Sequence, residues 1–125
     1  MRSDIIVIGG GAAGLVAAIG AAKTLSETQE GGTVTVLEKM PKAGRKIMIT
    51  GKGRCNFTNV KDWGGFSAHI NTDINFAGPA WHNLTPEEVI GLFKEYGMGA
   101  VVERGDRAFP ASHLASDVVD TLLRA

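Results

Sequence analysis

Three glycines near the start of the chain have the spacing of a phosphate-binding turn: Gly9, Gly11 and Gly14. Gly9 would permit a sharp turn, Gly11 would leave room for a pyrophosphate beside the backbone, and Gly14 would allow a helix to pack closely on a strand. Backbone N–H groups at the start of that helix, including those of Ala12 and Ala13, would face the phosphates. The spacing therefore predicts a dinucleotide site.

These glycines need a strand before them and a helix after them. Residues 5–8 read as a buried parallel strand, the apolar residues after Gly14 as a helix, residues 27–32 as a polar loop, and residues 33–38 as a second strand. Glu38 would accept hydrogen bonds from both ribose hydroxyls and repel a 2′-phosphate. We therefore expect a βαβ unit over residues 1–38 that prefers FAD or NAD(H) to NADP(H). The alternative is a plain tight turn and a solvated acid.

A basic, glycine-rich segment over residues 39–60 follows Glu38 directly. It carries six Lys or Arg residues between Lys39 and Arg54 and no acid before Asp62. On composition alone such a run is a solvated face or a nucleic-acid patch. Its place after the second strand also suits cations and glycine amides that contact a diphosphate, so we expect a cofactor loop here.

The chain resembles the N-terminal part of a known family in three motifs: VIGGGAAGLVAA, VLEKMPKAGRKIMITGKGRCNFTN and RAFPASHLASDVVDTLL. The family is the BaiN/RdsA, or aminoacetone-oxidase-like, family of NAD(P)/FAD-dependent oxidoreductases. The second motif is the most specific, and it departs from the family at Thr50, where Ser is usual, and at Lys52, which replaces a glycine. The resemblance implies an α/β, Rossmann-like domain of the glutathione-reductase type that binds FAD noncovalently.

The resemblance also implies which residues contact the cofactor. The glycine turn with Ala12 and Ala13 would hold the pyrophosphate, Glu38 the ribose, and Lys39 would flank the adenosine. The residues implied beside the pyrophosphate and the flavin ring are Gly44, Arg45, Lys46, Thr50, Gly51, Gly53, Arg54, Cys55 and Asn56. Lys46, Arg54 or Asn56 would stabilise negative charge on the reduced ring, and the alternative for each is phosphate binding or surface solvation.

The implied function is that of an FAD-dependent oxidoreductase with NAD(P)H as a candidate electron donor. The substrate would be a small molecule, with amines and unsaturated carbonyl compounds among the candidates, and the catalytic residues stay unassigned. Two alternatives from other classes remain. One is an NAD-binding regulatory or sensor module without catalysis, and the other is RNA binding through the basic segment.

The rest of the chain, residues 61–125, is predicted to start as irregular structure up to residue 84. A helix over 85–97, a strand over 100–104, a turn over 105–107 and a candidate edge strand at 109–110 follow. A C-terminal helix has an apolar stripe of Ala115, Val118, Val119, Leu122 and Leu123. Because this helical pattern continues to the last residue, we expect the N-terminal part of a longer protein, whose remainder is its partner and without which FAD binds weakly or not at all.

Composition fits a soluble, cytoplasmic α/β domain. The chain is 44% hydrophobic and 21% charged with a net charge of zero, so we expect neither a nucleic-acid nor a membrane partner. The uncharged run over residues 5–22 is interrupted by three consecutive glycines and is not a predicted membrane span. The single Cys55 cannot form an internal disulfide, and His69, His82 and His113 lack metal-ligand spacing.

Overall fold

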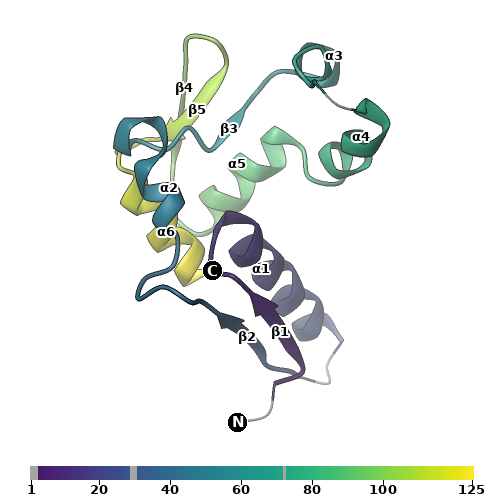
Figure 1. Ribbon diagram of the computed structural model, residues 1–125, viewed down its shortest axis with the longest axis vertical. Coiled ribbons are helices and arrows are strands. Elements are labelled where there is room, and N and C mark those ends of the chain that lie inside the picture. The colour runs from purple at the N-terminus through teal and green to yellow at the C-terminus, as the bar shows by residue number, and fades with distance from the viewer. Residues whose placement is uncertain (1–2, 29–30, 72) are drawn as a thin grey trace.

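Two small sheets and the helices around them form the structure, a computed structural model that describes residues 3–28, 31–71 and 73–125 (Figure 1). The elements are, in chain order, β1 (Ile5–Ile8), α1 (Ala12–Glu27), β2 (Val34–Leu37), α2 (Arg45–Ile49), a 3-10 turn η1 (Thr50–Gly53), β3 (Thr58–Asn59), α3 (Trp63–Ser67), α4 (Ile74–Asn83), α5 (Pro86–Glu95), β4 (Ala100–Glu103), β5 (Arg107–Pro110) and α6 (Ala115–Arg124). Strands β1 and β2 form a parallel pair, whereas β3, β5 and β4 form an antiparallel sheet in that order.

The predicted βαβ unit is confirmed. In the β1–β2 pair Ile5 lies opposite Val34 and Ile8 opposite Leu37, and α1 joins the two strands. Helix α1 continues to Glu27, so the predicted loop over 27–32 begins one residue later, and residues 29 and 30 of that loop lie outside the described residues.

Two glycines account for the tight junction between β1 and α1. Gly9 has a φ of +102°, a left-handed conformation that side chains disfavour. A Cβ atom added at Gly14 would lie 1.8 Å from the carbonyl oxygen of Gly9, so the helix approaches the strand end as closely as backbone atoms allow. The predicted roles of both glycines follow directly from this geometry.

The prediction that residues 5–8 are buried is wrong for one face of the strand. Ile6 and Ile8 are 58% and 86% exposed, and Leu37 on β2 is 52% exposed. Alternate residues of a strand point to opposite faces of the sheet, and α1 packs against β1 and β2 from one face. The apolar residues on the other face remain accessible to solvent among the described residues.

The two segments predicted as loops contain helices. Residues 39–60 include α2, η1 and β3, and residues 61–84 include α3 and α4, which lie at the end of the molecule away from β1 and β2 (Figure 1). The side chains of Asp62 and Asp73 accept hydrogen bonds from N–H groups at the starts of α3 and α4. Tertiary packing overcomes the low helix propensity of their glycines and of Pro79, because the ring of Trp63 packs 5.5 Å from that of Trp81.

Strand β5 is the central strand of its sheet, but its residues 109 and 110, which we predicted as an edge strand, are paired on one side only. Pro110 is tolerated there because β3 pairs only with Arg107 and Ala108, and Pro110 has a strand partner on the β4 side alone. The predicted strand over 100–104 is confirmed as β4, which ends at Glu103, and the turn covers residues 104–106 instead of the predicted 105–107 because Arg107 begins β5.

Helices α5 and α6 supply much of the core. The predicted capping of α5 is confirmed, because the Thr85 side chain accepts from Glu88 N and the Glu88 carboxylate accepts from Thr85 N. On α6 the predicted stripe is buried except for Leu123, which is 57% exposed, while Thr121 is buried instead. The core cluster is Leu15, Ile19, Ile47, Cys55, Phe93, Met98, Ala115, Val118, Val119 and Leu122.

Replacing Gly14 by Ala should destabilise the protein by about 1–3 kcal/mol or more, because the new methyl group overlaps the Gly9 carbonyl. Gly20→Ala is the matched control on the same helix, since Gly20 is exposed and its Cβ would meet no atom within 4 Å. That control should stabilise by about 0.5–1 kcal/mol through helix propensity. Urea unfolding midpoints measure both changes, and equal effects of the two substitutions would contradict the close approach.

Candidate cofactor-binding site

A cavity of about 1250 Å³ lies where the glycine turn, the segment after β2 and the helices α2, α5 and α6 meet. Its lining joins residues that are far apart in the sequence, from Ile8 at the end of β1 to Leu122 on α6. The lining combines backbone and charged groups with apolar side chains. This combination suits a ligand with a polyanionic half and a flat, less polar half.

The N-terminus of α1 opens into this cavity. Gly11 is the N-cap and makes no side-chain hydrogen bond, and the first turn of α1 contains no acidic residue. The first N–H groups of a helix have no carbonyl partner inside the helix and carry the positive end of its dipole. A Cβ at Gly11 would meet no atom within 4 Å, so space for an anion exists beside these groups.

Glu38 lies beside the glycine turn and is fixed by backbone hydrogen bonds. Its Oε1 accepts from Met40 N at 2.7 Å and its Oε2 accepts from Gly10 N at 2.7 Å. The Met40 bond and then the Gly10 bond lower the pKa of the carboxyl below its ordinary value of 4.5. The carboxylate is therefore ionised near neutral pH, and its stabilising contribution is lost only as the pH falls through that lowered pKa. Each oxygen keeps a further acceptor position for a ribose hydroxyl.

The basic segment after β2 is tied to the glycine turn through its backbone. Gly44 N donates to Gly10 O at 2.8 Å, and Gly44 has a φ of +71°. A Cβ at Gly44 would lie 2.7 Å from a methyl group of Val119, so α6 also requires glycine here. As a result Lys42, Arg45 and Lys46 line the same cavity as the helix N-terminus.

The cavity brings together most of the residues predicted to contact the cofactor. Those that line it are Gly9, Gly11, Ala12, Ala13, Gly14, Glu38, Gly44, Arg45, Lys46, Thr50, Cys55 and Asn56. Four predicted residues do not line it: Lys39, Gly51, Gly53 and Arg54. Their assignment to the cofactor stays a prediction.

Arg54 is engaged away from the cavity lining. Its Nη1 lies 2.9 Å from Glu103 Oε1, and its guanidinium carbon lies 4.2 Å from the centre of the Phe109 ring. Cys55, the next residue, is buried, and this burial raises the pKa of its thiol despite an opposing hydrogen bond with Thr50. The thiol is therefore mostly protonated at neutral pH, which disfavours a nucleophilic or redox role.

Asn56 also lines the cavity, but its N–H donors are occupied. In the orientation that its neighbours require, Nδ2 donates to Thr58 O at 2.8 Å and to Ala108 O at 3.1 Å. Both N–H donors of the amide are therefore used within the antiparallel sheet. From the sequence we expected Asn56 to donate to an anionic ring, and an amide whose donors are held in this way cannot do so.

Sequence reasoning missed two kinds of lining residue. Gly10 lies within the glycine turn and Lys42 within the basic segment. Their place in these two motifs was the signal that could have identified them. The apolar wall is different, because its residues read only as helix stripes or core. It consists of Ile47, Ile49, Phe57, Val89, Phe93, Val118 and Leu122.

Several aromatic side chains lie away from this cavity. The rings of Trp63, Trp81 and His82 pack on one another at α3 and α4. Within residues 3–28, 31–71 and 73–125, no cluster of three His, Cys, Asp or Glu residues could hold a metal ion. In the same residues no helix is both long and apolar enough to cross a membrane.

Comparison with known proteins identifies the family. The HI0933-like protein Rossmann domain matches residues 3–125. A 3-dehydro-bile acid delta(4,6)-reductase of Clostridium scindens is 32% identical to this chain in an alignment that covers 93% of the chain and 27% of that protein. Ribosomal RNA dihydrouridine synthases of Escherichia coli and Haemophilus influenzae are 35% and 38% identical over 78% and 77% of the chain.

The chain spans 22% of the length of each of the two synthases, so all three relatives are much longer than it. The family match nevertheless covers both sheets and all the helices described above. The protein therefore belongs to the HI0933-like Rossmann-domain family, which is the BaiN/RdsA family that its motifs resemble.

Proposed function

We propose that this chain binds FAD and serves a reductase that saturates a carbon–carbon double bond conjugated to a carbonyl group. The supporting observation is the shared cavity, where an uncapped helix N-terminus, an ionised Glu38 and three cations converge. Helix amides and cations suit a diphosphate, and the carboxylate suits a ribose. The apolar side chains of the lining suit a flat ring system.

The likeness to named relatives supports the choice of reaction. One relative is named as a reductase of a 3-dehydro bile acid, and two are named as synthases of dihydrouridine in ribosomal RNA. In chemical terms both names describe saturation of a double bond next to a carbonyl. Transfer of a hydride to such a double bond, with different protein surfaces that bind the substrate, accounts for both reactions.

The residues of this chain have definite tasks in such a reaction. The α1 amides with Lys42, Arg45 and Lys46 bind the phosphates, and Glu38 accepts from the ribose. The wall that includes Phe57, Phe93 and Val118 excludes water from the ring. A bound flavin would accept a hydride from a donor such as NAD(P)H and deliver it to the substrate.

An NAD-binding sensor module has less support from the fold. Such a module needs further regular βα units after β2, but the described residues continue into a short helix and the antiparallel sheet of β3, β5 and β4. The exposed face of Ile6, Ile8 and Leu37 instead suits burial by more of the same polypeptide. We propose that this remainder is the partner that completes FAD binding.

Gly11→Val in the full-length protein tests the cofactor assignment. Gly11 has φ −86° and ψ −173°, which Val adopts freely, and the new side chain enters open space, so the fold should be retained. We expect the flavin affinity to fall at least about tenfold, because the side chain occupies the place of the phosphate. Titration of the apoprotein with FAD, followed by flavin absorbance, measures the change.

Gly20→Val on the exposed side of α1 is the matched control and should bind FAD as the unmodified protein does. A full-length protein that is purified without flavin and takes up NADH but not FAD would contradict the proposal and favour the sensor. Retention of full FAD affinity by Gly11→Val would also contradict it.

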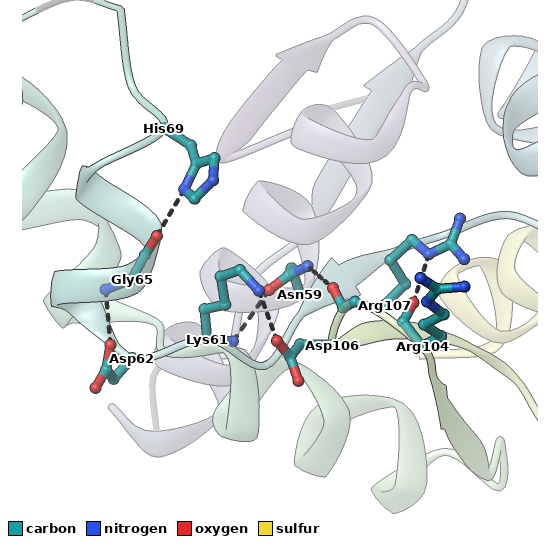
Figure 2. Close-up of polar contacts among 9 residues, drawn as sticks. Asn59, Lys61, Asp62, Gly65, His69, Arg104, Asp106 and Arg107 are labelled. Atoms are coloured by element: carbon teal, nitrogen blue, oxygen red, sulfur yellow. Dashed lines mark hydrogen bonds and ion pairs between the residues drawn. The ribbon is translucent and has the colours of Figure 1, made fainter.

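An RNA substrate is a second candidate, and one observation on the β4–β5 hairpin favours it. Arg104 and Arg107 are exposed neighbours, since Arg107 Nε donates to Arg104 O at 3.0 Å (Figure 2). In the part of the chain that the structure describes, neither forms an ion pair, whereas the adjacent Asp106 pairs with Lys61 at 2.5 Å. Unpaired guanidinium groups suit phosphodiesters. From the sequence we expected no nucleic-acid partner. That expectation stays a prediction, and RNA binding at this hairpin would contradict it.

Arg104→Gln with Arg107→Gln tests the second candidate. If RNA is bound there, a plot of log affinity against log salt concentration should be less steep for this variant than for the unmodified protein. The slope should fall by about 0.7 for each phosphate that the variant no longer neutralises. Lys23→Gln with Lys94→Gln removes the same charge at α1 and α5 and is the control. Filter binding of ribosomal RNA at several salt concentrations is the measurement, and equal slopes for both double variants would exclude binding of RNA at the hairpin.

A further inference from the structure

Val119 on α6 packs against the backbone of the basic segment. Helix α6 lies beside α2, and the Val119 side chain is part of the buried core (Figure 1). A Cβ atom added at Gly44 would lie 2.7 Å and 2.9 Å from the two methyl carbons of Val119. Both branches of the valine therefore face Gly44, and no side chain fits between the two residues.

Gly44 connects the glycine turn to α2 through both of its backbone groups. Its N–H donates to Gly10 O at 2.8 Å, and its carbonyl oxygen accepts from Met48 N at 3.2 Å. The N–H of Gly10 in turn donates to Glu38 Oε2 at 2.7 Å. The position of the Gly44 backbone therefore affects the glycine turn, the Glu38 carboxylate and the helix that carries two of the cavity's cations.

A glycine at this place needs an outside restraint. The φ of Gly44 is +71°, and glycine adopts left-handed and right-handed conformations about equally well. The methyl groups of Val119 supply a wall on one side of it. Helix α6 is itself held, because Arg124 Nη2 donates to Tyr96 O at 3.3 Å and Ala115 is buried. The wall therefore belongs to a fixed element.

We propose that Val119 is a positioning residue of the cofactor site, which holds Gly44 and through it the groups that bind the ADP half of FAD. This inference rests on the proposed function and adds a residue that the motifs did not mark. The residues of α6 that line the cavity are Val118 and Leu122, so Val119 acts through Gly44 and not by touching a ligand. Binding groups that are held in place beforehand lose less conformational freedom when the ligand binds, which raises affinity.

Val119→Ala in the full-length protein tests the effect on binding. Removing both methyl groups frees Gly44, so the affinity for FAD should fall about tenfold. The affinity for ADP should fall by the same factor, because the groups that lose their position are those for the phosphates and the ribose. Calorimetric titration of the apoprotein with each ligand measures both changes. A loss of FAD affinity with unchanged ADP affinity would overturn the inference.

Two control variants separate the shape of Val119 from its contribution to stability. Val119→Thr keeps both branches but buries a hydroxyl group, so it should lower the urea midpoint and keep the FAD affinity. Ile19 is 7% exposed, as Val119 is, and belongs to the same core cluster on α1 without lining the cavity. Ile19→Ala removes more carbon atoms, so it should destabilise at least as much and change the FAD affinity by less than about twofold. Equal losses of affinity in Ile19→Ala and Val119→Ala would contradict the positioning role.

A double variant tests the contact between the two residues. Gly44→Ala places a methyl group where the branches of Val119 lie, so it should weaken FAD binding by more than about tenfold. Val119→Ala in the same chain removes the overlap, and the double variant should bind FAD more tightly than Gly44→Ala does. Independent effects would instead multiply, so a double variant that binds more weakly than either single variant would overturn the inference.

Hydrogen exchange of the Gly44 N–H in the full-length apoprotein gives a result that does not depend on the cofactor. Val119→Ala should exchange this N–H at least about tenfold faster than the unmodified protein, because the hydrogen bond to Gly10 opens more often, whereas Val119→Thr should not. Equal exchange rates in Val119→Ala and the unmodified protein would overturn the inference and leave the proposed function intact. Failure of the proposed function looks different, because the unmodified protein would then bind neither FAD nor ADP.

Discussion

The site depends on the backbone contact between the end of β1 and the start of α1. The Gly9 carbonyl oxygen lies where a side chain at position 14 would begin, and this brings the first turn of α1 to the end of the strand. Gly10 then binds two other segments, since its N–H donates to Glu38 and its carbonyl accepts from Gly44. The helix amides, the carboxylate and the basic segment therefore hold fixed positions through main-chain atoms, and surface substitutions elsewhere leave them in place.

The electrostatics of the cavity follow from the same contacts. Glu38 and the cations Lys42, Arg45 and Lys46 line one space, yet within the described residues none of them forms an ion pair. Two N–H groups hold the Glu38 carboxylate and lower its pKa, so a neighbouring cation is not needed to keep it ionised. The positive side chains thus remain available for an anionic ligand, and Glu38 remains available for hydroxyl groups.

Local signals in the sequence predicted the βαβ unit, the capped helix α5 and most of the stripe of α6, because turns, caps and periodicity depend on near neighbours. The same reasoning missed α3 and α4, where Trp63 packs against Trp81. It also missed the apolar wall of the cavity, since a residue such as Val118 reads the same whether it faces the core or a ligand. The donor role expected for Asn56 failed for a similar reason, because carbonyl groups of β3 and β5 occupy both N–H donors of the amide.

The departure at Lys52 shows how strongly the turn before Asn56 is determined by its surroundings. Lys52 has a φ of +57° between Gly51 and Gly53, a left-handed conformation that costs a residue with a side chain roughly 1–2 kcal/mol. Its side chain is exposed, so packing does not offset this cost. The path is instead imposed by the contacts on either side, where Gly51 meets Asn56 and Phe109, and Arg54 meets Glu103. Lys52 is therefore tolerated in a left-handed conformation, because the backbone of the turn is held by its neighbours and the side chain is exposed.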